Sequence, residues 1–387
     1  MPITCAVLSA GRLGAVRHWI HIFAALALLS SLSLSADEPL KRRPIPAQDH
    51  RIPRTLLPLI HSAEAQRDLG IQGPDLDPLE TVLRSIDAEW LQARNKTEAE
   101  IHPILDRGTE TVLNHLRERH GEAAVARLHQ LELQAQGVRA LLRAELIDAL
   151  ELTTVQVRDL GRLFDATEDL RRRARLLVRQ PTPPNLAPYQ RALASERITA
   201  ERMLSADQIQ RWNTLLGPKQ NTAAYERVHP LAPAALESGA WLNGTNASLA
   251  ALRGRVLVVL FYSFQDANSL AANQACNRWH RSFANKGLSI IGVQSPRIDA
   301  ERDYAAFGVS LLRDRIQFPV LLDANKSNWD AWGNETWPTL FVVDRRGYIR
   351  GWWSGKLQNS NGGGEARIEQ MIRRLLEEPV PPPRTRP

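Results

Sequence analysis

The spacing of apolar residues divides the chain into two parts. Between residues 76 and 216 glycine is rare, and leucine, alanine, arginine, glutamate and glutamine dominate. Apolar side chains recur there at helical spacing, for example at Leu128 and Leu131 and again at Val138, Leu141 and Leu142, as in helices that bury one face. The pattern predicts an all-helical domain over residues 76–218, preceded by a proline- and arginine-rich linker over 37–75.

After Pro230 the pattern changes to short apolar runs that alternate with helical stretches. Residues 256–262 form an unbroken apolar run, which is typical of a central strand buried on both faces. Further strands are predicted at 288–293, 319–323, 339–344 and 348–353, and helices at 268–285, 300–315 and 365–378. A β-α-β core followed by a hairpin and a last helix implies an α/β domain with a mixed sheet over 231–376. Residues 377–387 are expected to be a proline-rich tail.

The first 36 residues have the composition of an export signal. Arg12 and Arg17 precede the apolar run 22–34, and small residues stand before Asp37. An uncleaved anchor is the alternative, although the run is short for a membrane-spanning helix. Both interpretations place the bulk of the chain in the periplasm or cell envelope. A membrane would be a partner only if the segment is not cleaved.

Composition excludes several classes of function. The net charge of +7 over 387 residues is too weak to indicate a nucleic-acid partner. The two cysteines, Cys5 and Cys276, are too few for a disulfide framework, a cysteine-based zinc site or an iron–sulfur cluster. We therefore expect neither a metal nor a cofactor.

One five-residue pattern occurs twice in the helical half, at residues 152–156 and 204–208. Thr153 and Ser205 are expected to cap helices, with Gln156 and Gln208 closing a capping box at the third helical position. The pattern resembles the Leu-Thr-x-x-Gln motif of the periplasmic Spy/CpxP family of helical chaperones and stress regulators. That resemblance implies chaperone-like activity, whereas capping alone implies none, and both interpretations stay open.

From residue 231 to 376 the chain resembles the thioredoxin superfamily. The similarity is to its TlpA/peroxiredoxin-like class, with particular likeness to the thioredoxin-like domains of DipZ and of NHL-repeat-containing proteins. It rests on the segments 253–256, 261–264, 287–296, 332–339 and 344–347. The resemblance implies a cis peptide bond at Trp337-Pro338. It also implies that this loop lies against the start of the active-site helix and accepts extended substrate backbone.

The sequence departs from this family where the redox chemistry takes place. The family's Cys-x-x-Cys would fall at residues 266–269, which read Asp-Ala-Asn-Ser. Thiol exchange needs a thiolate nucleophile and a resolving thiol, so Asp266 and Ser269 cannot perform it. Asp266 and Asn268 are instead good helix N-caps. We assign no catalytic residue, and the resemblance implies that a peptide groove survives at Asp266, Asn268, Ser269, Trp337 and Pro338.

Cys276 is the one thiol of the α/β half. It shares an apolar helical stripe with Ala272, Trp279 and Phe283, where a free cysteine acts as a small hydrophobic residue. The sequence therefore favours an exported thioredoxin-like protein without the redox dithiol. Such a protein would act as a binding, scaffold or chaperone-like module whose partner is a protein or an extended peptide. The alternative is a thiol–disulfide oxidoreductase or peroxidase-family protein that uses Cys276.

Overall fold

The computed structural model describes residues 52–178, 187–220, 230–233, 236, 239–244, 249–357 and 363–380. All of these residues belong to one compact unit. Within them, no helix combines the length and the apolar character needed to cross a membrane. Residues 1–36, where the export signal is expected, lie outside the described residues.

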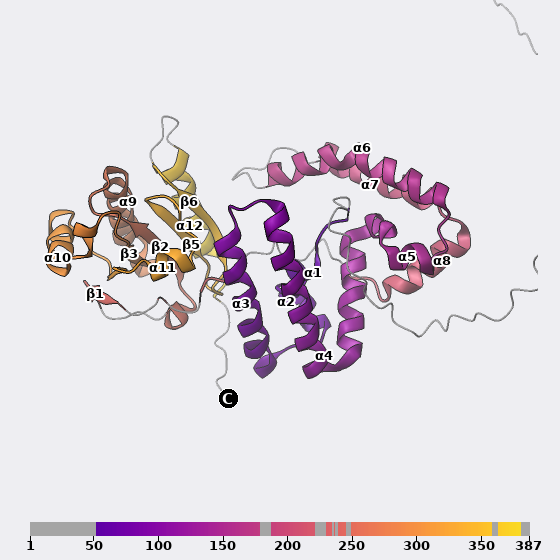
Figure 1. Ribbon diagram of the computed structural model, residues 1–387, viewed down its shortest axis with the longest axis horizontal. Coiled ribbons are helices and arrows are strands. Elements are labelled where there is room, and N and C mark those ends of the chain that lie inside the picture. The colour runs from indigo at the N-terminus through magenta and orange to yellow at the C-terminus, as the bar shows by residue number, and fades with distance from the viewer. Residues whose placement is uncertain are drawn as a thin grey trace, which may run out of the picture. The chain divides into compact units, whose positions relative to one another are not determined.

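The first half is helical, as its apolar periodicity predicts. Its main helices are α3 (Leu76–Ala93), α4 (Glu98–Gln136), α5 (Ala144–Ala149), α6 (Thr154–Val178), α7 (Ala187–Arg202) and α8 (Ala206–Leu216). α3 packs against α4, and α6 runs beside α7 (Figure 1). Gly121 interrupts α4 with a φ of 78°, a conformation that glycine adopts at little cost.

Part of the expected linker is folded. Two short helices, α1 (Leu56–Ile60) and α2 (Ala63–Asp68), lie within residues 37–75. The side chains of Leu56 and Ile60 are buried in the core that α3 and α4 share. The proline-rich composition obscured this short apolar run, whose burial provides a reason for it to fold.

The second half is built on a mixed six-stranded sheet. Its strands are β1 (Ala240–Leu242), β2 (Val256–Tyr262), β3 (Leu288–Gln294), β4 (Val320–Leu322), β5 (Thr339–Val343) and β6 (Ile349–Ser354). Their order is β1-β4-β3-β2-β5-β6. β2, β3 and β4 are parallel, whereas β5 is antiparallel to both β2 and β6 and β1 is antiparallel to β4. The structure thus confirms the predicted α/β half with a mixed central sheet.

The helices of this half are α9 (Ala267–Phe283), α10 (Tyr304–Arg313), α11 (Ser327–Ala331) and α12 (Gly363–Glu377). α9, α10 and α12 correspond to the three predicted helices. α11 and the three-residue strand β1 were not predicted, because elements this short show no clear period.

Both faces of β2 are buried, which explains its unbroken apolar sequence. Val258 and Leu260 belong to a core with residues of α9, α10 and α12. The alternate residues Val259 and Phe261 belong to a second core on the other face, as the two-residue period of a strand requires. This second core includes Leu91 of α3. The helical half therefore supplies part of the cover of the sheet.

The end of α3 makes close contact with the loop before β5. Arg94 Nη1 donates a hydrogen bond to the Trp332 carbonyl oxygen at 2.6 Å. The adjacent Gly333 has a φ of +58°, and a Cβ at this position would lie 2.5 Å from the Leu91 carbonyl oxygen. Glycine is therefore required here both by its conformation and by the approach of the helix.

A buried histidine joins α1, α3 and the first residues of the α/β half. His61 Nδ1 lies 2.9 Å from the Leu57 carbonyl oxygen, and Nε2 lies 2.8 Å from Asp87 Oδ2. The same carboxylate oxygen accepts the Leu231 N–H at 2.8 Å. Because a carbonyl and a carboxylate can only accept, this geometry favours the imidazolium form of His61, in which both ring nitrogens donate.

Candidate functional site

The turn between β2 and α9 holds the residues at the position of the family's dithiol. Asp266 is the N-cap of α9, and its Oδ2 accepts the Ser269 N–H at 2.7 Å. The capping expected of Asp266 is confirmed. Asn268 lies inside the first turn of the helix and caps nothing, because the chain becomes helical at Ala267. The Asp266 carboxylate satisfies an N–H group that would otherwise lack a partner.

Ser269 faces the interior. It is fully buried, and its hydroxyl accepts the Ser263 N–H at 3.3 Å. The hydroxyl therefore ties the end of β2 to the first turn of α9. Its burial keeps this side chain away from any partner on the surface.

The loop that precedes β5 carries the expected cis bond. The Trp337-Pro338 peptide is cis, which confirms the prediction. In the register of the sheet, Thr339 is opposite Phe261, so Pro338 lies at the same edge as the turn that contains Asp266. Trp337 is partly exposed, stacks on Trp329 with ring centroids 4.1 Å apart, and donates its indole N–H to the Ser295 carbonyl oxygen at 2.9 Å.

A buried carboxylate that sequence reasoning missed organises the neighbouring loops. Glu301 is fully buried. Its Oε1 accepts the Ser263 hydroxyl at 2.6 Å and the Gln265 N–H at 2.9 Å, and its Oε2 accepts the Arg297 N–H at 2.8 Å. The helix expected from about residue 300 is divided: Glu301 lies in a short 3-10 helix, Asp299–Arg302, and α10 begins at Tyr304 with Asp303 as its cap. Glu301 thereby links the loops after β2 and β3.

A second buried carboxylate, Asp323, holds the segment after β4. Its Oδ2 accepts the Ser295 hydroxyl at 2.8 Å and the Trp329 N–H at 2.9 Å. It therefore positions the start of α11 and, through Trp329, the ring on which Trp337 stacks. The carboxyl ends of parallel strands are the usual place for a binding site in an open α/β sheet. Here the buried side chains of Glu301 and Asp323 fix the loops at that end of the sheet.

Cys276 lies in the core between α9 and the sheet, as its apolar stripe predicts. Its side chain is fully buried. Burial raises the pKa of the Cys276 thiol, because a thiolate loses its hydration in an apolar environment. Among the described residues, no group of three or more histidine, cysteine, aspartate or glutamate side chains is placed to hold a metal ion.

The two five-residue motifs, at 152–156 and 204–208, are capping boxes, as predicted. The Thr153 N–H donates to Gln156 Oε1 at 2.9 Å, and the Gln156 N–H donates to the Thr153 hydroxyl at 3.2 Å. Ser205 and Gln208 form the same pair of bonds at the start of α8. Each motif therefore begins a helix.

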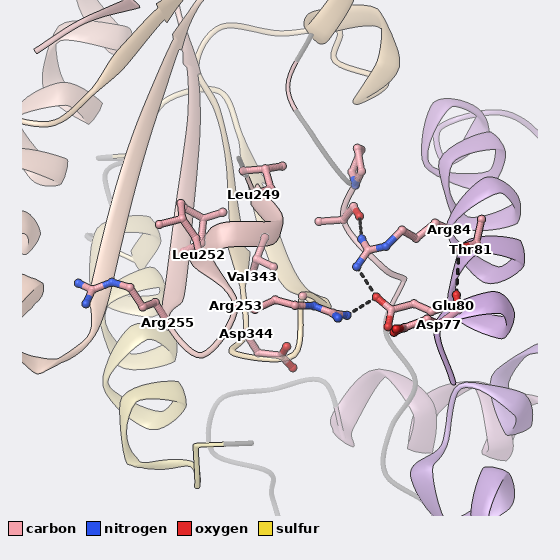
Figure 2. Close-up of a pocket in the computed structure, with 14 residues that line it drawn as sticks. Asp77, Glu80, Thr81, Arg84, Leu249, Leu252, Arg253, Arg255, Val343 and Asp344 are labelled. Carbon is pink, nitrogen blue, oxygen red and sulfur yellow. Dashed lines mark hydrogen bonds and ion pairs between the residues drawn. The ribbon is translucent and has the colours of Figure 1, made fainter. Parts of the chain in front are cut away.

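A cavity of about 240 Å³, lined by both apolar and charged side chains, lies between α3 and the α/β half, at the opposite end of the sheet. Figure 2 shows that the guanidinium groups of Arg84 and Arg253 both pair with the Glu80 carboxylate. None of the residues expected at the site lines this cavity. Its paired charges join the two halves of the chain, and we do not treat it as the functional site.

Comparisons with known proteins match part of the chain. Residues 233–351 match the model of the AhpC/TSA family. Protein DipZ of Mycobacterium tuberculosis is 26% identical over 145 residues, which are 36% of this chain and 20% of DipZ. Thiol-disulfide oxidoreductase YkuV of Bacillus subtilis is 24% identical over 36% of this chain and 89% of its own. The chain thus spans only a fifth of DipZ but nearly all of YkuV.

Two further similarities are to an NHL-repeat protein and to a solved structure. NHL repeat-containing protein 2 of Gallus gallus is 31% identical over 97 residues, 25% of this chain and 13% of that protein. The solved structure of a thiol-disulfide isomerase from Corynebacterium glutamicum covers 39% of this chain and 98% of its own, with 24% identity and a TM-score of 0.34. The sheet topology gives the α/β half of this chain a thioredoxin-like fold, and the family match makes it similar to the redoxin class of that superfamily.

Proposed function

We propose that this protein is an exported binding, scaffold or chaperone-like module of the cell envelope. Its thioredoxin-like domain would hold extended protein segments without exchanging thiols. The observation that carries this proposal is Asp266, whose carboxylate caps α9 where the family places its nucleophilic thiol. A carboxylate in this position stabilises the helix but cannot attack a disulfide.

The burial of Cys276 argues against the rival function, a thiol–disulfide oxidoreductase or peroxidase. A reactive cysteine is exposed and has a lowered pKa. Cys276 is fully buried within α9, and burial raises the pKa of its thiol. The thiol therefore lacks both the access and the ionisation that disulfide exchange requires.

We call the end of the sheet that carries the Trp337-Pro338 bond and the turn at Asp266 the cis-proline edge. Its geometry supports a binding role. Glu301 and Asp323 fix the loops around this edge through buried hydrogen bonds, so the surface is preorganised and a partner would lose little free energy in ordering it. In the superfamily whose fold this domain shares, the cis-proline loop accepts extended backbone. We extend that role to Trp337 and Pro338.

The helical half and the N-terminus complete the proposal. The two capping-box motifs resemble those of periplasmic helical chaperones, which favours a role in holding client proteins. Export rests on the basic and apolar pattern of residues 1–36. Mass analysis of the protein isolated from cells tests this part: a chain that begins just after residue 35 or 36 supports export, and a chain that keeps residues 1–36 and stays in the cytoplasm contradicts it.

An insulin-reduction assay tests the absence of thiol chemistry. With dithiothreitol as reductant, the protein should not accelerate insulin precipitation, and Cys276→Ala should behave as the wild type does. Titration of thiols should find Cys276 unreactive in the native protein and reactive after denaturation. Acceleration that disappears in Cys276→Ala would establish the oxidoreductase function instead.

A further inference from the structure

A lysine ammonium lies on the tryptophan pair at the cis-proline edge. Lys326 Nζ is 4.8 Å from the centroid of Trp337 and 5.2 Å from that of Trp329. Both distances are within the range of cation–π attraction. The backbone of Lys326 has a φ of 64° at the N-cap of α11, which Asp323 holds through its bonds to the first turn. The cation is therefore positioned by the fold.

A second cation borders the same surface. Arg297 follows Ser295, whose carbonyl oxygen accepts the Trp337 indole N–H. Its backbone is fixed by Glu301. The Arg297 side chain is 59% exposed, and its Nη1 lies 3.6 Å from Asp266 Oδ1. A long contact of this kind at an exposed position contributes little to stability, so the guanidinium is available to a partner.

Within the part of the chain that the structure describes, the Lys326 ammonium contacts aromatic rings. Among the described residues, none forms an ion pair with this ammonium, whose recorded contacts are the two indole rings. Glu335 is the acidic residue of the cis-proline loop, and its charge acts on Arg94 of the helical half. The surface around Trp337 therefore combines an aromatic ring with two accessible cations.

We propose that this surface recognises acidic extended segments, with side-chain carboxylates of the partner meeting Lys326 and Arg297 on either side of Trp337. The inference rests on the proposed peptide-binding function and adds the chemical class of the partner. Charge complementarity determines which partner binds and how fast the two proteins associate. A basic or neutral segment would offer a carboxylate to neither cation.

Two matched peptides test this inference with the full chain. One is an extended, fluorescently labelled peptide with alternating glutamate residues, and the other replaces each glutamate with glutamine. At low salt the acidic peptide should bind about threefold to tenfold more tightly, since each exposed ion pair adds a modest contribution. The difference should shrink as salt screens the charges. Fluorescence anisotropy measures both dissociation constants.

Variants assign the effect to the two cations. Lys326→Gln and Arg297→Gln should each weaken binding of the acidic peptide by about twofold to fivefold and leave the glutamine peptide unchanged. Lys286→Gln is the matched control, because Lys286 lies 5.8 Å from the Phe283 ring at the far end of α9. It should change neither dissociation constant. Thermal melts verify that each variant is folded.

The outcomes separate this inference from the proposed function. Equal binding of the two peptides overturns the acidic preference and leaves peptide binding intact. Unchanged binding of the acidic peptide by both cation variants also overturns the assignment to Lys326 and Arg297. If neither peptide binds, the result contradicts the proposed function itself.

Discussion

The side-chain amides of Gln156 and Gln208 are hydrogen-bonded to each other. Gln156 Nε2 donates to Gln208 Oε1 at 2.8 Å and to the Met203 carbonyl oxygen at 2.8 Å. Gln208 Nε2 in turn donates to the Leu150 carbonyl oxygen at 3.1 Å. The two capping motifs therefore do more than begin α6 and α8, since their glutamines join the two helix starts to each other.

Because the side-chain amides of Gln156 and Gln208 are hydrogen-bonded to each other, their contributions to stability should be coupled. Gln156→Ala and Gln208→Ala should each lower the free energy of unfolding by about 0.5–1.5 kcal/mol, the usual contribution of a hydrogen bond. A double-mutant cycle measured by urea unfolding should give a coupling of about 0.5 kcal/mol or more. Strict additivity would show that the two motifs are independent caps. Asn213→Ala is the control, because its amide bonds only within α8.

Stability should depend on pH through His61. Burial opposes the charge of this imidazolium, but the ion pair and hydrogen bond with Asp87, together with the bond to Leu57, outweigh burial and raise the pKa of His61. A group whose folded pKa is raised stabilises the protein fully below its unfolded pKa, about 6.5 for histidine. That stabilisation is lost as the pH rises through the folded value.

Urea unfolding from about pH 6 to about pH 9 measures this effect. The wild type should lose stability across the range, and His61→Gln should flatten the dependence. His102→Gln in α4 serves as the control and should keep the wild-type profile. A wild-type stability that rises with pH across the range would contradict the imidazolium assignment.

Glu301 should be more important for stability than any exposed acid near it. Glu301→Gln replaces an acceptor with an N–H₂ group that faces other donors, and should cost about 1–3 kcal/mol. Asp299→Asn is the matched control: this carboxylate is 96% exposed and pairs only with Arg302, so the change should stay within about 0.5 kcal/mol. Denaturant unfolding measures both variants. Equal effects would mean that Glu301 does not organise the edge.

Gly333 should be needed for α3 to dock on the cis-proline loop. Gly333→Ala forces a strained φ and places a Cβ 2.5 Å from the Leu91 carbonyl oxygen, so it should cost about 1–3 kcal/mol. Gly363→Ala has open space around the new methyl group and should be nearly neutral. Proteolysis of the variants should cut Gly333→Ala faster between residues 93 and 98. Equal resistance would contradict the docking.

Local signals predicted the features that depend on neighbouring residues. The two capping boxes, the Asp266 cap and the buried stripe of Cys276 each depend on residues within a few turns of one another. The unbroken apolar sequence of β2 predicted that both faces are buried, but it could not identify Leu91 as one of the residues that bury it. That contact joins segments more than 150 residues apart, and periodicity carries no information about such a pairing.

The candidate site was predicted only in part for the same reason. Family resemblance located Asp266 and the cis bond at Pro338. Glu301, Asp323 and Lys326 were missed, because nothing local marks an acid whose partners lie in other loops. Lys326 contacts Trp337 from a left-handed backbone conformation, which lysine rarely adopts.

The central claim is that the cis-proline edge binds protein without thiol chemistry. The most direct measurement is the affinity of an unfolded, fully carboxymethylated client, which contains no thiol or disulfide, for the wild type and three variants. Trp337→Ala should weaken binding, whereas Cys276→Ala and the surface control Trp352→Ala, which removes a ring 41% exposed on β6, should bind as the wild type does. Failure of the wild type to bind, or loss of binding in Cys276→Ala with Trp337→Ala unaffected, would contradict the account.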